Sequence, residues 1–302
     1  MTRPTRGTPA GQAYLDLQNR ARAEHRATQE LLILYVVERW LARLSVSPHA
    51  GQFVLKGGML LAAFDARRPT ADVDTLARGF ANDEVSVVAR VVAVAGQPVP
   101  DDGVTFHTRT VTSRVIRDAD LYSGVRVAMD CAIATAIVKL RLDVNFGDPI
   151  TPAPQRIELL ALRPGQPPVH VFGYPVQTVL AEKIATAIAL GPANTRVRDY
   201  ADVYTLIGSR PVAHAGVREA LLATTTHRGT DVVALSTVIG DLVALRSQTY
   251  QAYRSGLGPD GETLPAVPEV VDTVATFADR LAETAPPTTA WNPSTRHWID
   301  DS

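Results

Sequence analysis

The sequence is poor in cysteine and in long hydrophobic runs, and each shortage excludes a class of protein. A single cysteine, Cys131, stands among 302 residues, so neither a disulfide framework nor a cysteine-rich zinc site can form within the chain. No apolar run approaches the roughly 18 residues of a membrane-spanning helix, and the N-terminal residues lack the apolar centre of a secretory signal. We therefore expect a cytoplasmic protein with no membrane partner.

Lysine is also scarce, and its positions carry information. Only three of the 30 basic residues are lysine, namely Lys56, Lys139 and Lys183. Lysine is a compact point charge and arginine a planar fork, so the two do not exchange freely at a tight phosphate site. The lysines are therefore candidate phosphate ligands, although three residues can also fall at such positions by chance. The net charge of −1 excludes a global basic field but allows a local basic patch.

The hydrophobic pattern predicts helices first, then mixed strands and helices, then helices again. Strands are predicted at 53–56, 71–76, 104–116, 122–146, 157–162 and 169–172. Helices are predicted at 28–44, 57–64, 82–95, 178–190 and from 198 to about 285. This order is typical of an α+β fold with an N-terminal helical segment (1–50), a core of mixed sheet flanked by helices (51–175) and a C-terminal helical lobe (176–302). The lobe ends in a Pro/Thr-rich tail, whose packing the sequence does not decide.

Two pairs of residues near the first predicted strand suggest chemistry. Asp72 and Asp74 stand two residues apart on a predicted strand, so their carboxylates share a face, where a divalent cation would relieve their repulsion. Gly57 and Gly58 stand between a strand and a helix, where backbone N–H groups can approach a phosphate. Each signal is weak alone, because the glycines could form a simple turn and the aspartates a solvated strand edge.

The clearest strand alternation, at 139–146, adds a third carboxylate. The apolar residues at alternate positions from Leu140 to Phe146 must pack inward. Asp143 then lies on the polar face together with Lys139 and Arg141. A carboxylate beside two cations favours a functional site, and a solvated strand face with mutually neutralising charges is the alternative.

In combination, these elements resemble the nucleotidyltransferase fold of the polymerase-β type. More narrowly, they resemble the AbiEii/DUF1814 family, the toxins of type IV toxin–antitoxin pairs, including the mycobacterial MenT-type toxins. The resemblance rests on five elements that follow the family's order between about residues 53 and 207. They are Leu55-Lys56-Gly57-Gly58, the run from Arg68 to Asp74, the strand end from Leu142 to Asp148, the run from Leu180 to Ile184, and the run from Arg196 to Tyr204.

The resemblance implies an activity and its partners. A member of this family would transfer a nucleoside monophosphate from an NTP to an acceptor and release pyrophosphate, with Mg²⁺ as cofactor and Mn²⁺ as the alternative ion. For MenT-type toxins the implied acceptor is the 3′ end of tRNA, where added pyrimidines block aminoacylation and hence translation. A cognate antitoxin, often a winged-helix regulator, would be encoded nearby and need not form a stable complex.

The resemblance also assigns roles to individual residues. Asp72, Asp74 and Asp143 would bind the metal, and Asp143 would help to activate the acceptor hydroxyl. Lys183 would contact nucleotide phosphates, and one of Asp199 and Asp202 would position it or a base. The residues that the resemblance places at the nucleotide are Lys56, Gly57, Gly58, Lys183 and Asp202, and those it places in catalysis are Asp72, Asp74, Asp143, Lys183 and Asp199.

Several points stay open at the level of sequence. Met59 stands where the family usually has Ser or Thr, which would shift the grip on phosphate to backbone amides and lysine. Asp130 is the alternative third carboxylate if the strands pair differently. The acceptor could also be a protein or a small molecule, or the chain could be a catalytically inactive binding partner.

Arginines provide two candidate surfaces for a phosphate backbone. The first set is Arg20, Arg22, Arg26, Arg39 and Arg43, and the second is Arg196, Arg198 and Arg210. The alternative for the first set is that these arginines form a solvated helix face.

Overall fold

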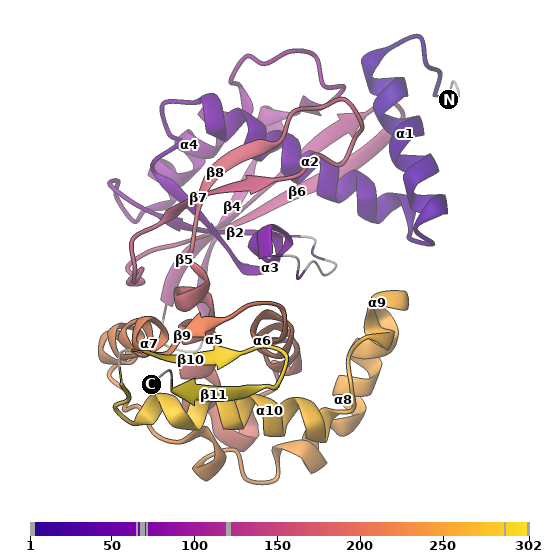
Figure 1. Cartoon of the computed structure of the whole chain (residues 1–302). Coiled ribbons are helices and arrows are strands. Elements are labelled where there is room, and N and C mark those ends of the chain that lie inside the picture. Colours follow the sequence, from indigo (N-terminus) through magenta and orange to yellow (C-terminus); the bar gives the residue numbers. More distant parts are fainter. Residues whose placement is uncertain are drawn as a thin grey trace. The chain divides into compact units, whose positions relative to one another are not determined.

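The computed structural model describes residues 4–64, 66, 70, 72–118, 122–286 and 288–300 (Figure 1). Within the predicted Asp-containing motif, Arg68, Pro69 and Ala71 lie outside the described residues. The chain divides into two compact units, and each is described by itself. Unit 1 holds the described residues within 1–63, 69–147 and 155–173, and unit 2 holds those within 64–68, 148–154 and 174–302.

Unit 1 is built on a mixed sheet with helices against it. Its helices are α1 (Pro9–Ala23), α2 (Thr28–Val46), α3 (Gly57–Leu61) and α4 (Glu84–Ala95), with a short 3-10 turn η2 (Thr108–Thr110). Its strands are β1 (Phe53–Lys56), β2 (Val73–Ala77), β3 (Thr105–Phe106), β4 (Thr112–Asp118), β5 (Tyr122–Ile133), β6 (Ala136–Asn145), β7 (Gln155–Leu159) and β8 (Val169–Gly173).

The strand order confirms the predicted mixed sheet. Over the described residues the sheet runs β3-β5-β6-β2-β1-β8-β7, and β4 pairs with β5 outside this path. The pairs β1–β8 and β2–β6 are parallel, whereas β1–β2, β5–β6, β4–β5 and β7–β8 are antiparallel. The parallel pair β2–β6 matters most, because it sets the predicted carboxylate motifs side by side.

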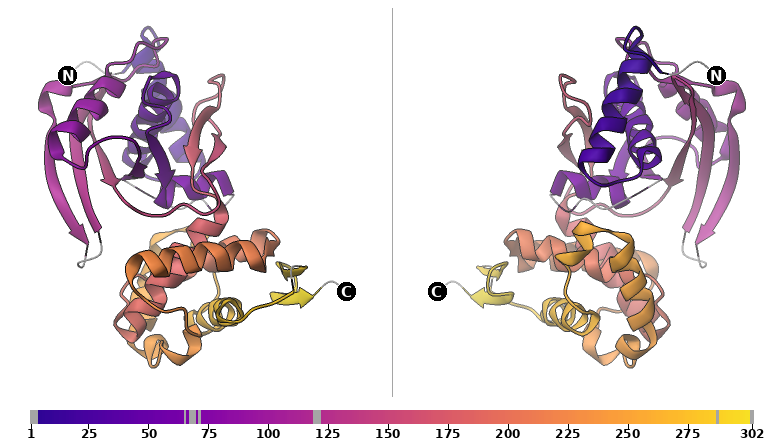
Figure 2. Two further views of the ribbon diagram at one scale, coloured as in Figure 1. Left: turned by 90° about the vertical axis from the view of Figure 1, so that its left-hand side faces the viewer. Right: turned by 90° about the vertical axis from the view of Figure 1, so that its right-hand side faces the viewer.

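One face of this sheet holds the core of unit 1. Leu140, Leu142 and Val144 of β6 are fully buried, as their alternation predicts. Helix α2 contacts both β6 and β8, and Figure 2 shows α1 and α2 within the curl of the twisted sheet. Because side chains alternate along a strand, Asp143 must point to the opposite face, away from α2.

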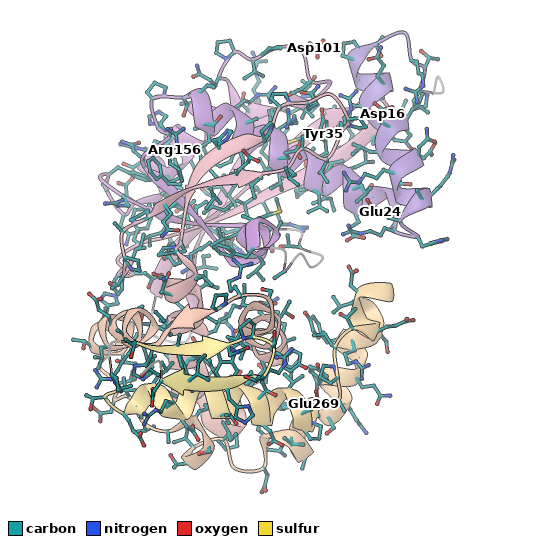
Figure 3. All side chains as sticks on the ribbon, viewed as in Figure 1. Asp16, Glu24, Tyr35, Asp101, Arg156 and Glu269 are labelled. Atoms are coloured by element: carbon teal, nitrogen blue, oxygen red, sulfur yellow. The ribbon has the colours of Figure 1, made fainter. Side chains whose placement is uncertain are left out.

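Hydrogen bonds and ion pairs tie α1 and α2 to the loops around them. Arg163 donates to the Tyr35 hydroxyl at 3.2 Å and to Asp16 at 3.0 Å. Figure 3 labels Tyr35 on α2 and Asp16 on α1. Arg43 donates to Asp102 at 2.6 Å, and both side chains are buried. The expectation that the N-terminal arginines bind a phosphate backbone is therefore wrong for Arg43. It is also wrong for Arg39, which is buried and paired with Glu38 at 2.5 Å.

Unit 2 is helical with a small sheet. Its helices are α5 (Val176–Leu190), α6 (Val197–Ser209), α7 (His214–Arg228), α8 (Leu242–Gly256), α9 (Pro259–Glu262) and α10 (Val267–Asp279), and its 3-10 turns are η3 (Gly191–Ala193), η4 (Leu235–Thr237) and η5 (Arg280–Ala282). A further turn, η1 (Ala62–Phe64), lies where the two units meet in sequence. The small sheet consists of β9 (Val212–Ala213), β10 (Thr289–Asn292) and β11 (His297–Asp300) in the order β11-β10-β9.

The Pro/Thr-rich tail packs onto unit 2 through its tryptophans. The indole N–H of Trp291, which is fully buried, donates to the carbonyl of Ile207 at 2.9 Å. Its ring centroid lies 5.0 Å from that of Phe277 and 5.5 Å from that of Trp298. The structure thus settles a question that the sequence left open. Across the described helices of both units, none has the length and apolarity needed to cross a membrane.

Candidate active site

A row of charged residues crosses unit 1 on the sheet face opposite α2. In the strand registers, Asp74 of β2 lies beside Asp143 of β6, and Lys56 of β1 lies on the other side of Asp74. Arg126 of β5 lies beside Asp143, and Arg114 of β4 lies beside Arg126. Register partners share a face. The row therefore has two carboxylates at its centre, with Lys56 on one flank and two arginines on the other.

Asp143 is held by a guanidinium that the sequence did not single out. Arg126 donates from Nε to Oδ1 at 2.6 Å and from Nη2 to Oδ2 at 2.5 Å. This bidentate hydrogen bonding raises the pKa of the Arg126 guanidinium above its already high ordinary value. The cations predicted beside Asp143 have other partners, because Lys139 pairs with Asp130 at 2.9 Å and Arg141 lies near Asp72.

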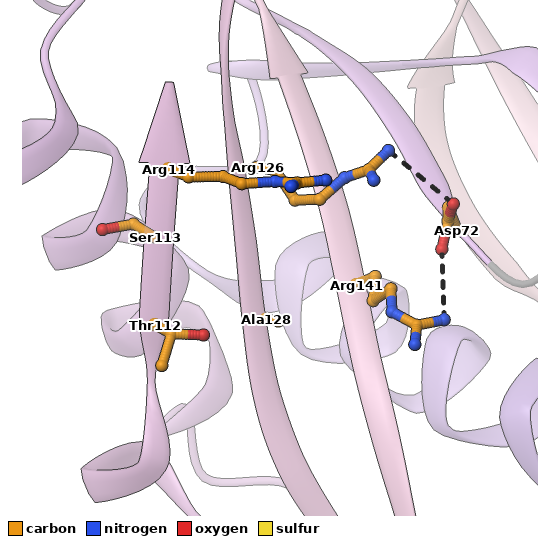
Figure 4. A pocket seen from close by; sticks show the side chains of 7 residues that line it. All are labelled: Asp72, Thr112, Ser113, Arg114, Arg126, Ala128 and Arg141. Carbon is orange, nitrogen blue, oxygen red and sulfur yellow. Dashed lines mark ion pairs between the residues drawn. The ribbon is translucent and has the colours of Figure 1, made fainter. Parts of the chain in front are cut away.

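Asp72 stands just before β2 with its carboxylate between two arginines. Its oxygens lie 3.9 Å from Nη2 of Arg126 and 3.9 Å from Nη1 of Arg141, as the dashed lines of Figure 4 mark. These separations are too long for hydrogen bonds. Oδ1 of Asp72 is buried and has no hydrogen-bond partner among the described residues. A buried carboxylate oxygen of this kind can accept a further ligand.

Gly57 touches Asp74 directly. Gly57 opens α3 with a φ of +65°, a backbone conformation that favours glycine. A Cβ on Gly57 would overlap the Asp74 carboxylate and would lie 2.8 Å from the Asp74 Cβ. The glycine motif and the aspartate motif therefore meet, with the Asp74 carboxylate against the backbone at the start of α3.

The carboxylates suit a divalent ion, although they do not form a complete cage. Over the described ranges, no group of three or more His, Cys, Asp or Glu side chains is placed to share an ion. Both oxygens of Asp143 are held by Arg126. However, magnesium is commonly bound by one or two carboxylates together with substrate phosphates. Asp72, whose Oδ1 accepts no hydrogen bond from the described residues, and the neighbouring Asp74 fit that smaller donor set.

Two open questions from the sequence receive partial answers. Asp143, and not Asp130, is the register partner of Asp74. Asp130 lies opposite Lys139 instead, further along β5. Met59, which replaces the family's hydroxyl residue, is 7% exposed and forms part of the apolar core. Only backbone groups could contact phosphate at that position.

Unit 2 gathers the other predicted residues into a buried ion cluster. Nζ of Lys183 on α5 donates to Asp199 at 2.6 Å and to Asp202 at 2.7 Å, both on α6. Arg196 donates to the second oxygen of Asp199 at 2.6 Å. Asp202 is 5% exposed, so it is not a solvated helix residue. Arg210, from the second arginine set, donates to the Phe64 carbonyl.

The charges of this cluster stabilise one another. Burial alone would raise the pKa of Asp199, but Lys183 and Arg196 lower it to about 2. Burial alone would lower the pKa of Lys183, but Asp199 and Asp202 raise it above its ordinary value. Asp199 and Lys183 therefore both stay charged at neutral pH.

A cavity opens on the polar face of the sheet in unit 1. It has a volume of about 540 Å³. Figure 4 shows the guanidinium groups of Arg126 and Arg141 reaching toward Asp72, with Thr112, Ser113 and Arg114 on the neighbouring strand. We call this cavity the arginine pocket, lined by Asp72, Thr112, Ser113, Arg114, Arg126, Ala128 and Arg141. The sequence did not single out Arg114 or Arg126, because only strand pairing brings Arg126 beside Asp143 and Arg114 beside Arg126.

Comparison with known protein families assigns the chain. Residues 39–277 match the family model described as nucleotidyl transferase AbiEii toxin of type IV toxin–antitoxin systems. The chain belongs to the AbiEii family. The match covers most of the chain, including both the carboxylate row of unit 1 and the ion cluster of unit 2. The resemblance inferred from the motifs is thereby confirmed.

One solved structure agrees with this family at the level of the fold. A crystal structure of a candidate nucleotidyltransferase from H. pylori has a TM-score of 0.50 at 15% identity, covering 85% of this chain and 96% of that one. The structure of JHP933 from Helicobacter pylori has a TM-score of 0.41 at 14% identity, covering 82% and 92%. No curated protein matched the chain. As an AbiEii family member with this fold, the chain is a nucleotidyltransferase of a toxin–antitoxin system.

Proposed function

We propose that this AbiEii family member transfers a nucleoside monophosphate from an NTP to the 3′ end of tRNA, and that the added nucleotides block translation. The observation that supports this proposal most is the pairing of Asp74 with Asp143 on parallel strands, directly beside Gly57. That arrangement sets carboxylates next to a glycine-opened helix, where a triphosphate and a divalent ion can meet. The cognate antitoxin would be encoded nearby.

In the proposed reaction the oxygen of the acceptor's terminal hydroxyl bonds to the α-phosphorus of the NTP. The bond from that phosphorus to the α,β-bridging oxygen breaks, and pyrophosphate leaves with the electron pair. When bound, Mg²⁺ or Mn²⁺ would supply positive charge that eases loss of the hydroxyl proton and stabilises the leaving pyrophosphate.

The residues of the chain have separate tasks in this proposal. Asp72 and Asp74 hold the ion, and Asp143 takes the proton of the acceptor hydroxyl. Arg126 must release an oxygen of Asp143 for that step, since it now holds both. Lys56, Gly57 and Gly58 lie on the side of Asp74 where the triphosphate would bind. The phosphate role of Lys183, with Asp199 and Asp202 as its positioning partners, stays a prediction from the family resemblance.

Labelled nucleotide transfer tests the proposal. The purified chain is incubated with each α-labelled NTP, Mg²⁺ and total tRNA, and label at the 3′ end of tRNA is expected. Asp143→Asn should lower the rate by about 10²–10⁴-fold, as expected for loss of a general base. Asp130→Asn is the matched control, because its carboxylate pairs with Lys139 on the same sheet, and it should keep the parental rate.

The outcomes separate the alternatives. An equal loss in both variants would contradict the assignment of Asp143. Label on a protein or a small molecule, with none on tRNA, would identify a different acceptor. The absence of any metal-dependent transfer by the parent would sink the proposal and favour an inactive binding partner.

A further inference from the structure

We propose that the arginine pocket binds the phosphodiester backbone of the acceptor strand, next to the strand's reacting 3′ end. This inference rests on the proposed function and adds to it the place where the acceptor binds. It is carried by the charges of the pocket, by its size and by its position relative to Gly57.

The charges of the pocket call for an anion. Arg114 and Arg126 lie directly opposite each other on β4 and β5, and like charges in this relation destabilise a sheet. Asp143 compensates Arg126. The side chain of Arg114 is exposed and makes no hydrogen bond or ion pair with any described residue. Arginine forks match phosphate oxygens in a bidentate manner, so a phosphate group would satisfy the unmatched guanidinium.

Neighbouring side chains extend the same chemistry. Arg141 contributes a third guanidinium, whose side chain is 45% exposed and lies 3.9 Å from Asp72. Thr112, two residues before Arg114, adds a hydroxyl on the same strand face. The volume of about 540 Å³ lies within the range of roughly 300–1,000 Å³ typical of small-ligand sites, which is room for a nucleotide-sized group.

The position of the pocket indicates which phosphate it takes. In phosphoryl transfer the attacking and leaving oxygens lie roughly in line on opposite sides of the phosphorus. The carboxylate pair Asp74 and Asp143 lies at the centre of the row, on β2 and β6. Gly57 touches Asp74 from the β1 side, whereas the pocket lies on the β5 and β4 side. A triphosphate bound at the glycines would therefore release pyrophosphate on the side away from the pocket. The acceptor hydroxyl would then approach the α-phosphorus from the side of the pocket.

Equilibrium binding without chemistry tests the inference. A short single-stranded RNA labelled at its 5′ end is titrated with the full chain, with neither NTP nor divalent ion present, and its fluorescence anisotropy is measured at several salt concentrations. Arg114→Ala and Arg141→Ala should each weaken binding by about ten-fold, the size of one charge-assisted contact. Each should also flatten the slope of log affinity against log salt by about 0.7, as for one lost phosphate contact on a single strand.

Controls keep the measurement specific. Arg156→Ala removes an exposed arginine of β7, at the opposite edge of the sheet, and should leave RNA binding unchanged. Circular dichroism verifies that each variant folds, and Arg114→Glu, which reverses the charge at an exposed position, should weaken binding further. Binding of a non-hydrolysable NTP analogue with Mg²⁺ should change by less than about two-fold in the pocket variants.

The outcomes of the transfer and binding experiments distinguish a failure of this inference from a failure of the proposed function. Failure of nucleotide transfer together with the expected RNA-binding pattern would remove the function and leave the pocket assignment standing. Unchanged RNA affinity in both arginine variants, or no RNA binding by the parent chain, would overturn the assignment. Loss of NTP-analogue binding with intact RNA binding would also overturn it and would make the pocket a triphosphate site.

Discussion

The contact between Gly57 and Asp74 joins two sequence motifs into one site. The glycine has a positive φ, and its missing Cβ leaves the space that the Asp74 carboxylate occupies. A turn elsewhere in the chain would need only the positive φ, as at Gly79, where a Cβ would meet nothing within 4 Å. Position 57 therefore requires glycine for two reasons: the backbone has a positive φ, and a Cβ would overlap the Asp74 carboxylate.

This difference gives a residue-scale prediction. Gly57→Ala and Gly79→Ala should each cost about 1–2 kcal/mol of stability for placing alanine in the left-handed region. Only Gly57→Ala should also displace Asp74, and a misplacement of about 1 Å can lower the rate by roughly 100-fold. Urea unfolding and the rate of labelled nucleotide transfer, measured on both variants, check this. Equal activity in the two variants would mean that the Gly57–Asp74 contact has no catalytic value.

At the scale of elements, the ion cluster links α5 to α6. Lys183 projects from α5, and both of its carboxylate partners project from α6 with 4% of each side chain exposed. Removing one member of a buried ion pair leaves the remaining charge uncompensated, which costs about 3–5 kcal/mol. Pairs between exposed charges contribute only about 0–1 kcal/mol.

Two of the three lysines, the buried Lys183 and the exposed Lys139, allow a comparison of a buried with an exposed ion pair. Lys183→Met should lower the free energy of unfolding of unit 2 by about 3–5 kcal/mol. Lys139→Met removes a lysine whose side chain is 49% exposed and paired with Asp130, and it should cost less than about 1 kcal/mol. Urea unfolding followed by circular dichroism measures both. Similar small losses would show that the cluster contributes little to joining α5 and α6.

The cluster also sets a pH window for stability. The pKa of Asp199 is lowered to about 2 from an ordinary 3.8, so its contribution is fully present above its ordinary pKa and is lost as the pH falls toward 2. The pKa of Lys183 is raised above 10.5, so its contribution is present below 10.5 and is lost as the pH rises through the raised value. The stability difference between the parent and Lys183→Met should therefore be largest between these limits and should shrink at both ends.

At the scale of the whole molecule, the chain has two separate cores. In unit 1, Trp40 of α2 packs edge-on against Phe53 at a centroid distance of 5.8 Å. In unit 2, Trp291 of β10 packs against Phe277 of α10. The tail therefore supplies a principal core residue of unit 2.

Replacement of the tail tryptophan tests its contribution. Trp291→Ala should destabilise unit 2 by about 3–5 kcal/mol, the usual cost of truncating a buried tryptophan. Ile299→Ala, at a 43% exposed position on the adjacent strand β11, should change stability by less than about 0.5 kcal/mol. Thermal unfolding of both variants provides the comparison. A negligible effect of Trp291→Ala would mean that the tail is not part of the folded core.

Much of the fold and part of the candidate site follow from local sequence. The alternation of Leu140, Leu142 and Val144 predicts the strand and its buried face, because side chains of a strand alternate with a period of two. Gly57, Asp74 and Asp143 are recognisable because each stands in a short motif that can be read directly along the chain. Arg126 and Arg114 are not, since nothing local to either residue indicates that strand pairing places Arg126 beside Asp143 and Arg114 beside Arg126.

The sequence by itself determined much of the helix and strand pattern of unit 1, the family and the carboxylates that are candidates for the metal, but it did not predict α1 or the small sheet β9–β11. Tertiary structure alone decided that Asp143 lies beside Asp74, that Arg126 holds Asp143 with two hydrogen bonds, and that Asp130 lies opposite Lys139. The physical reason is that strand register is a long-range property, set by the packing of whole faces of the sheet. A shift of one residue in the pairing register of β6 would turn Asp143 into the core. The residue pattern within a single strand does not show which residue of the neighbouring strand Asp143 will lie beside.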